Sequence, residues 1–230
     1  MKSKIVVTGG LGFIGSHTVV ALQKQGFDVV IIDNLSNSSL DVLAGIMKIT
    51  QISPEFENID LRDKEAVVNF FEKYPKIIGV IHFAASKAVG ESVENPLLYY
   101  ENNLAGLIYI LKELSHKNEA NFIFSSSCTV YGQADTLPIS ENAPVKKAES
   151  PYGNTKQIGE EIIEDTCKMS ENLNAIALRY FNPIGAHESA KIGELPIGTP
   201  QNLVPFITQT GIGLREQLSV FGNDYPTKDG

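Results

Sequence analysis

The chain has 230 residues, which is enough for one large domain with a substantial core and part of a second. Its composition, 43% hydrophobic and 20% charged, is close to that of ordinary globular proteins and argues against long disordered tracts. The net charge of −8 argues against a nucleic-acid partner, no apolar run is long enough to span a membrane, and the two cysteines, Cys128 and Cys167, fit a reducing, cytoplasmic setting.

Short β-branched runs alternate with longer segments of helical periodicity from the first residues onward. The runs 5–8, 29–32, 80–83, 122–125 and 175–181 predict buried strands, and the segments 13–25, 63–73, 97–117 and 152–171 predict helices. Parallel strands need helical crossovers of this kind. The sequence therefore predicts an α/β fold, a doubly wound parallel sheet with helices on both faces.

The pattern changes after Phe181. Prolines and glycines interrupt the segment 183–200, which is typical of a loop-rich second region. Within that region, we expect residues 202–214 to form a helix and residues 217–222 to form a short strand.

A glycine-rich segment joins the first predicted strand to the first predicted helix. It reads Gly9-Gly10-Leu11-Gly12-Phe13-Ile14-Gly15. Glycines permit a tight turn and let a pyrophosphate approach the helix N-terminus, where free N–H groups and the helix dipole favour anions. Asp33 follows the second predicted strand, 18 residues after Gly15, close to the offset of a carboxylate that binds an adenosine ribose. A carboxylate there repels a 2′-phosphate, so the sequence predicts an NAD site.

Three polar residues indicate acid–base chemistry. Tyr152 and Lys156 have the spacing Y-x-x-x-K at the start of a predicted helix, which places them one turn apart on one face. A phenol has a pKa near 10, and an ammonium group about 4 Å away at an effective dielectric of about 20 would lower it by about three units. Ser127 lies at the carboxyl end of a predicted strand, where ligands of parallel sheets bind. The sequence therefore predicts Ser127, Tyr152 and Lys156 as a catalytic trio.

Seven segments in chain order resemble one known family. They are TGGLGFIGSH, DNLSNSS, HFAASKAVGES, NFIFSSSCTVYG, SPYGNTK, RYFNPIGAH and FGNDYPTKDG. Together they resemble the UDP-glucose 4-epimerases, which are extended short-chain dehydrogenase/reductases with a Rossmann-type fold. The resemblance extends from residue 4 to residue 230. It implies epimerisation at C4 of a UDP-hexose through a transient 4-keto sugar, with tightly bound NAD.

The resemblance also implies a role for individual residues. The catalytic positions are the predicted trio. The positions that match cofactor contacts are Gly9, Gly12, Phe13, Ile14, Gly15, Asp33, Asn34, Asp60, Leu61, Phe83, Ala84, Ala85, Lys87, Asn102, Tyr152, Lys156 and Phe181. The positions that match substrate contacts are Lys87, Ser127, Thr129, Tyr152, Asn182, Asn202, Ser219, Val220 and Phe221.

The chain departs from the family pattern at two points. Cys128 stands where the family usually has a small residue such as alanine, and we interpret its thiol as packed and inert. The family's remaining contacts to uridine diphosphate, including an arginine, lie beyond Gly230. We therefore expect an NAD-binding Rossmann domain over 1–182 and an incomplete smaller substrate-binding domain over 183–230. We also expect the 230-residue chain to bind NAD better than a UDP-sugar and to be inactive by itself.

Three other functions use the same fold. A nucleotide-sugar 4,6-dehydratase needs an additional acid–base pair, but Ser127-Cys128-Thr129-Val130 contains no carboxylate. A UDP-glucuronate epimerase or decarboxylase needs a cation for the sugar carboxylate, which we do not locate. A non-catalytic NAD-sensing protein typically loses the tyrosine or the lysine, and both are present. The four histidines lack the spacing of metal ligands, so we expect no metal site.

The predicted helices 97–117 and 152–171 carry apolar residues beyond one narrow stripe. The resemblance implies a homodimer that forms through these helices. Packing within the core of one chain is an almost equally good explanation of the same pattern.

Overall fold

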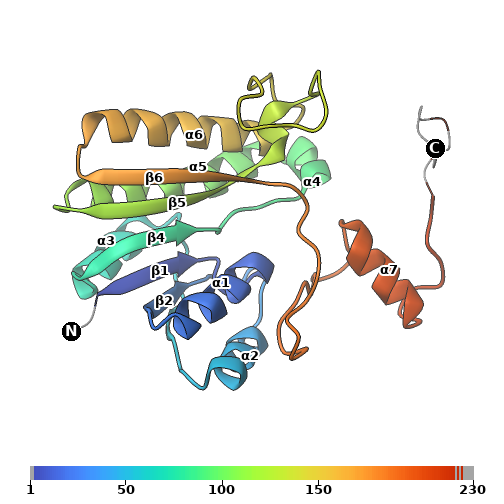
Figure 1. Cartoon of the computed structure of the whole chain (residues 1–230), viewed down its shortest axis with the longest axis horizontal. Helices are drawn as coiled ribbons and strands as arrows, with labels where there is room; N and C mark the ends of the chain where they lie inside the picture. Colours follow the sequence, from blue (N-terminus) through green and yellow to red (C-terminus); the bar gives the residue numbers. More distant parts are fainter. Residues whose placement is uncertain (1–2, 221, 223, 225–230) are drawn as a thin grey trace.

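A computed structural model describes residues 3–220, 222 and 224 of the chain. Its centre is a six-stranded parallel sheet with the strand order β3-β2-β1-β4-β5-β6, and helices lie on both faces of this sheet (Figure 1). The structure confirms the predicted doubly wound parallel fold.

The elements follow the predicted alternation of strand and helix. The strands are β1 (Lys4–Thr8), β2 (Asp28–Ile32), β3 (Glu55–Glu57), β4 (Ile77–His82), β5 (Ala120–Ser127) and β6 (Leu173–Tyr180). The helices are α1 (Phe13–Lys24), α2 (Leu40–Thr50), α3 (Lys64–Lys73), α4 (Val89–Glu94), α5 (Pro96–Ser115), the 3-10 helix η1 (Cys128–Tyr131), α6 (Pro151–Met169) and α7 (Leu203–Gly211).

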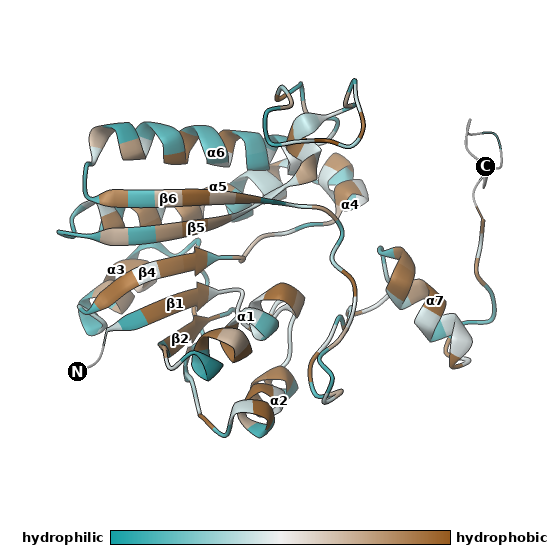
Figure 2. Cartoon of the chain, in the orientation of Figure 1, coloured by the Kyte–Doolittle hydropathy of each residue, from teal (hydrophilic) through white to brown (hydrophobic). Residues whose placement is uncertain are grey.

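Two apolar layers hold the helices against the sheet. On one face, α3, α5 and α6 pack on the sheet around Phe70, Leu107 and Phe122. On the other face, α1 and α2 pack around Val19 and Ile46. Because helices cover both faces, β1, β2 and β4 are apolar at nearly every position, whereas the outer side of α6 is largely polar (Figure 2).

The sheet has a topological switch point at β1. The chain places β2 and β3 on one side of β1 and then crosses over to place β4, β5 and β6 on the other side. In such sheets, the crevice outside the carboxyl ends of the strands at the switch point binds ligands. The segments that follow β1, β4 and β5 all start from this edge.

The structure contains elements that the sequence did not predict, and its described residues lack one strand that the sequence did predict. The elements α2, β3 and α4 were not predicted. Strand β3 has only three residues, EFE, and no buried run that would reveal it. The strand predicted for 217–222 is wrong, because residues 217–220 and 222 are not in a strand and Val220 is 84% exposed. An extended segment needs a neighbouring strand to accept its hydrogen bonds, and alternating apolar residues alone do not provide one.

The segment that follows β6 returns to the face covered by α1 and α2. Ile192 is buried in that apolar layer, and a Cβ atom on Gly45 of α2 would lie 2.5 Å from the carbonyl oxygen of Lys191. Helix α7 then lies away from the sheet (Figure 1). The division of the chain at residue 182 stays a prediction. Among the helices described, none has the length and apolar character needed to cross a membrane.

Candidate functional site

The glycine-rich loop after β1 depends on glycine at specific positions. Gly9 has a φ of +63°, and a Cβ atom on it would lie 2.8 Å from the backbone nitrogen of Ala84. A Cβ atom on Gly15 would lie 2.2 Å from the carbonyl oxygen of Gly9. Gly12 occupies the N-cap position of α1 and has no side chain with which to cap the helix. The first-turn N–H groups of α1 therefore remain able to bind an anion such as a diphosphate.

Asp33 lies at the carboxyl end of β2 and is 8% exposed. Its carboxylate accepts hydrogen bonds from the backbone nitrogens of Leu11 (3.1 Å) and Leu35 (3.0 Å) and from the hydroxyl of Ser38 (2.7 Å). An ionised carboxylate has about four acceptor positions, so about one remains for a ribose hydroxyl. Asp33 thus fixes the glycine loop to the segment after β2 and keeps the capacity that was predicted for it.

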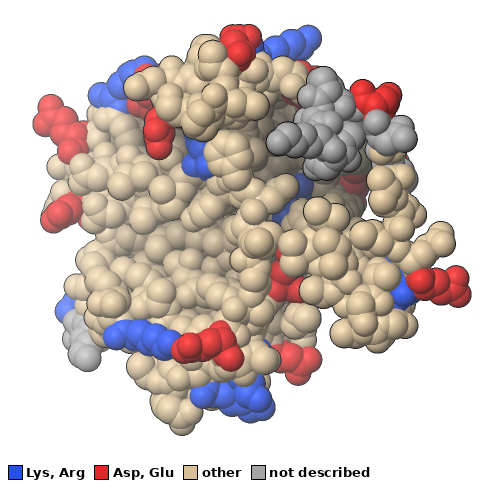
Figure 3. All heavy atoms as spheres, turned by 45° about the vertical axis from the view of Figure 1, so that its right-hand side comes forward, with Lys and Arg blue, Asp and Glu red and all other residues tan. Residues whose placement is uncertain are grey.

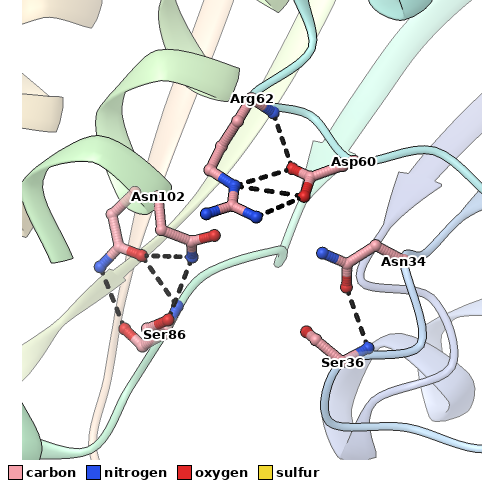
Figure 4. Close-up of polar contacts among 7 residues, drawn as sticks. Asn34, Ser36, Asp60, Arg62, Ser86 and Asn102 are labelled. Atoms are coloured by element: carbon pink, nitrogen blue, oxygen red, sulfur yellow. Dashed lines mark hydrogen bonds and ion pairs between the residues drawn. The ribbon is translucent and has the colours of Figure 1, made fainter. Parts of the chain in front are cut away.

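A polar cluster surrounds a common space next to this loop (Figure 4). Asn34 comes from the segment after β2 and Asp60 from the segment after β3; Asn102 comes from α5. Arg62, which the sequence did not single out, donates to Asp60 with Nη2 at 2.6 Å from Oδ2 and so lowers the pKa of that carboxyl. The Asn34 side chain also lowers the pKa of Asp60, so the two predicted cofactor residues lie close together. Leu61, by contrast, is buried in the apolar layer beneath α5.

A buried asparagine connects this cluster to α6. Asn103 is 5% exposed; its Oδ1 accepts from the backbone nitrogen of Ser86 (2.8 Å), and its Nδ2 donates to the carbonyl oxygen of Ser86 (3.0 Å) and to the hydroxyl of Thr155 (3.1 Å). The predicted residue Asn102 beside it donates to the Ser86 hydroxyl (3.1 Å). Ser86 follows the predicted cofactor-lining segment after β4 (Phe83, Ala84, Ala85), so these bonds hold that segment against α6 at Thr155, which lies between Tyr152 and Lys156 in the sequence. On its other side the segment lies against the glycine loop at Gly9.

The structure brings the predicted trio together. Ser127 ends β5, is 7% exposed, and its side chain lies close enough to Tyr152 to affect the pKa of the phenol. Tyr152 lies in the first turn of α6, which is capped by the hydroxyl of Ser150. Lys156 is 4% exposed, and its Nζ lies 5.8 Å from the centre of the Tyr152 ring and donates to the carbonyl oxygen of Ser125 at 2.7 Å.

The protonation equilibria of the trio differ from the expectation. Burial raises the pKa of Tyr152; the neighbouring Ser127 side chain opposes this rise and nearby Cys128 adds to it. Burial also lowers the pKa of Lys156 to about 8. The expected acidification of the phenol by Lys156 is therefore not found in the chain alone, because loss of solvation disfavours both charges. His82, whose Nδ1 is 2.8 Å from the Thr8 hydroxyl, is buried beside Lys156 and has a pKa of about 3, so it is neutral.

Two predicted residues meet at a glutamate that the sequence did not single out. Glu194 lies in the loop after β6 with its side chain 10% exposed. Its Oε1 accepts from Nδ2 of Asn202 at 2.5 Å and lies 3.5 Å from Nζ of Lys87. Three distant segments therefore converge on one carboxylate. No local pattern marks Glu194, because its partners lie 8 and 107 residues away.

The remaining predicted cofactor and substrate residues are less enclosed, except for one atom of Thr129. The Oγ1 atom of Thr129 is buried and is the one such side-chain atom in the described part of the chain that has no hydrogen-bond partner. Phe181 is 56% exposed, and Asn182, Ser219 and Val220 are also exposed. Phe221 lies outside the described residues.

Charge is distributed without a single dominant sign on the face shown in Figure 3, where acidic and basic side chains are interspersed. Within the described ranges, no group of three or more His, Cys, Asp or Glu side chains is placed to hold a metal ion. The arrangement offers an uncapped helix N-terminus, a buried carboxylate with acceptor capacity left, and a serine next to a tyrosine with a buried lysine. These are groups for binding a dinucleotide and for moving a proton.

Comparison with known proteins gives one consistent result. The model of the NAD dependent epimerase/dehydratase family matches residues 5–220. The chain is 49% identical to the UDP-glucose 4-epimerase of Schizosaccharomyces pombe and 50% identical to that of Neisseria meningitidis serogroup A. These alignments cover 100% and 98% of this chain but 65% and 66% of the relatives, so the chain spans about two thirds of their length.

Solved structures show the same similarity. The UDP-glucose 4-epimerase of Stenotrophomonas maltophila, solved with bound NAD and formylated UDP-arabinopyranose, has a TM-score of 0.93 at 45% identity and is matched over 99% of this chain and 67% of its own. The enzyme from Bifidobacterium longum, in complex with NAD+ and UDP, has a TM-score of 0.94 at 41% identity, over 99% of this chain and 68% of its own.

Proposed function

This chain belongs to the NAD dependent epimerase/dehydratase family, as its motifs predicted, and we propose that the whole protein is an NAD-dependent UDP-glucose 4-epimerase. The reaction is the reversible inversion at C4 of a UDP-hexose, which interconverts UDP-glucose and UDP-galactose. One observation carries the proposal: Ser127, Tyr152 and Lys156 lie together at the carboxyl edge of the sheet in a chain about half identical to UDP-glucose 4-epimerases.

The described residues fit NAD. The first turn of α1, with Phe13 and Ile14, suits the diphosphate because no side chain caps its N–H groups. Glycine keeps the loop in front of it tight, since added Cβ atoms at Gly9 or Gly15 would collide with neighbouring backbone. Asp33 suits the adenosine ribose, and its charge disfavours a 2′-phosphate. When bound, NAD supplies the acceptor for the C4 hydride of the sugar and the donor that returns it.

The chain's own residues provide the proton transfer. The Tyr152 phenolate would take the proton of the sugar 4-hydroxyl, becoming a neutral phenol, and would return that proton after the keto sugar has turned over in the site. The Ser127 side chain lies next to that phenol and lowers its pKa, so it would relay or orient the proton. Lys156 would bind the nicotinamide ribose and place a positive charge beside the phenolate.

Binding of the UDP-sugar is supported by two features. The unpartnered Oγ1 atom of Thr129 lies two residues after Ser127, where a sugar hydroxyl would satisfy it. Lys87 and Asn202 converge on Glu194 at the same edge of the sheet.

The segment from Ser127 to Val130 contains no carboxylate, so nothing in it favours a 4,6-dehydratase.

The decisive experiment compares the whole protein with its Tyr152→Phe variant. We expect the wild type to interconvert UDP-galactose and UDP-glucose, and the variant to lose about 10²–10⁴-fold in kcat, the usual contribution of a general acid–base, while NAD stays bound. Tyr109→Phe, on α5 and packed against the apolar layer, is the matched control. Absence of interconversion by the wild type would refute the function, and normal turnover by Tyr152→Phe would refute the assigned role.

We also propose that the protein is a cytoplasmic homodimer that pairs through α5 and α6. Part of α5 serves the chain's own core, because Leu107, Ile110, Leu111 and Leu114 are buried in it. The proposed dimer therefore uses the remaining faces of the two helices. Sedimentation of the whole protein measures its mass in solution, and the mass of a single chain would contradict the dimer.

A further inference from the structure

An ion pair between α6 and β6 lies one helical turn beyond the proposed catalytic trio. Glu160 follows Lys156 by one turn of α6 and Tyr152 by two turns. Arg179 of β6 binds its carboxylate with two hydrogen bonds, from Nε to Oε1 (3.0 Å) and from Nη2 to Oε2 (2.7 Å). The two side chains are only 16% and 23% exposed.

The same carboxylate also holds the end of β5. The hydroxyl of Ser126, which is 2% exposed, donates to Oε1 of Glu160. Ser126 and Arg179 are partners in the β5–β6 register, and the next pair, Ser127 and Tyr180, is the last one before the strands end. One carboxylate therefore joins α6 to both strands at the point where the catalytic serine leaves the sheet.

A fourth element joins this group. The guanidinium carbon of Arg179 lies 4.8 Å from the centre of the Tyr131 ring, and Tyr131 is buried in η1, the helix that follows Ser127. Strand β6 is the edge of the described sheet and has a strand on one side only. The lateral position of the β5–β6 end therefore depends on contacts with α6 and η1.

We propose that Glu160 and Arg179 position Ser127 against Tyr152, so that this ion pair acts as a positioning device for the reaction. The inference rests on the proposed function of the trio. Ser127 shares a peptide bond with Ser126, and Tyr152 belongs to the same rigid helix as Glu160, so the distance between the two hydroxyls is set by how the pair holds β5 to α6. A bidentate Arg–carboxylate contact restrains direction as well as distance.

Two other contacts join α6 to β5 and to η1, but they restrain different atoms. Lys156 donates to the carbonyl oxygen of Ser125 (2.7 Å), and Gln157 donates to that of Val130 (3.0 Å). Both bind main-chain oxygens, and neither reaches β6. The Glu160–Arg179 pair is the contact that links α6 to a side chain of β5 and to β6 together.

The ionisation of Tyr152 reports on this geometry. The titratable groups that face the phenol or its neighbours are Lys156, Cys128, Tyr99 with its bonded Glu91, and His82 beside Lys156. Glu160 is two turns away and paired with Arg179, so its removal acts on Tyr152 through Ser127. If Ser127 moves away from Tyr152, the phenolate loses the stabilisation that Ser127 gives it, and the pKa of Tyr152 rises further.

The first test is a tyrosinate absorbance titration of the 230-residue chain, read as the difference between each protein and the same protein carrying Tyr152→Phe. We expect Glu160→Gln to move the Tyr152 transition upward by about one pH unit, the size expected for one hydrogen bond to a charged group. Glu164→Gln, one turn further along α6 at an exposed ion pair with Lys168, is the matched control and should not move it. An unmoved transition in Glu160→Gln would overturn the proposal.

The second test uses the whole protein. We expect Glu160→Gln and Arg179→Lys to lower kcat about tenfold at unchanged KM and NAD content, since lysine keeps the charge but not the two parallel bonds. Wild-type kcat in Arg179→Lys would overturn the geometric role, and Arg179→Lys carries the test if Glu160→Gln fails to fold. An inactive wild type would refute the proposed function alone, because the titration needs no turnover.

Discussion

Asn103 gives the most direct test of how the site is held together. It is buried on α5 and bonds to both backbone groups of Ser86 and to the hydroxyl of Thr155 in α6. Asn103→Leu keeps a similar volume and removes the three bonds that join different segments, along with the local bond that Oδ1 accepts from Asn102. At a net value of about 1 kcal/mol for each bond, we expect the free energy of unfolding to fall by about 3 kcal/mol. For a chain of this size that corresponds to a drop of about 6–12 °C in Tm.

The same change should weaken NAD binding, because Ser86 belongs to the segment that packs between the glycine loop and α6. Urea denaturation of the 230-residue chain measures the stability, and calorimetric titration with NAD measures the affinity. Asn121→Ala is the control: this asparagine is exposed and makes one bond, to the carbonyl oxygen of Ile78 (3.2 Å). If Asn103→Leu costs no more than Asn121→Ala, the connection between the β4 segment and α6 does not stabilise the fold as argued.

Three further predictions concern the cofactor and the buried charges. Gly15→Ala should abolish NAD binding in calorimetry, because its Cβ atom would lie 2.2 Å from the Gly9 carbonyl oxygen, whereas Gly90→Ala, which meets open space, should not. The pKa of Lys156 is about 8 in the fold against 10.5 for the unperturbed group. Between these pH values the unfolded chain binds one more proton than the folded chain, so the free energy of unfolding rises with pH. Relative to Lys156→Met, the wild type should gain about 3 kcal/mol between pH 8 and pH 10.5 in denaturant titrations, and a difference that does not change with pH would contradict the burial argument. NAD should lower the pKa of Tyr152 more than NADH does, because only the oxidised nicotinamide is positively charged; equal tyrosinate titrations with the two forms would refute this.

Local patterns were sufficient to predict the parts of the site that lie within one strand–loop–helix unit. The glycine spacing after β1, Asp33 after β2, and the Tyr152–Lys156 spacing on α6 each express a constraint between residues that are close in sequence. The strands of the covered sheet were equally visible, since burial on both faces leaves continuous apolar runs. Strand β3 and the wrongly predicted strand at 217–222 show the limit, because pairing with a neighbour decides whether such short segments are strands.

Contacts between distant segments were invisible for the same reason. Glu194 meets Lys87 across 107 residues, and Asn103 meets Thr155 across 52. Neither residue stands in a spacing pattern that indicates a partner. Their importance follows from tertiary packing, which brings distant segments of the candidate site into hydrogen-bonding distance of these two side chains.

The charge state of Tyr152 shows most clearly what the sequence does not contain. A Y-x-x-x-K spacing places an ammonium group near a phenol, and Coulomb's law alone then predicts an acidic phenol. The fold buries both groups, and burial penalises each charge separately. Since burial makes the phenol of the chain by itself less acidic than a free tyrosine, we expect the positive charge of an oxidised nicotinamide to lower the pKa of Tyr152 when the cofactor binds. Coupling of this kind would keep the base protonated until an electron acceptor is in place.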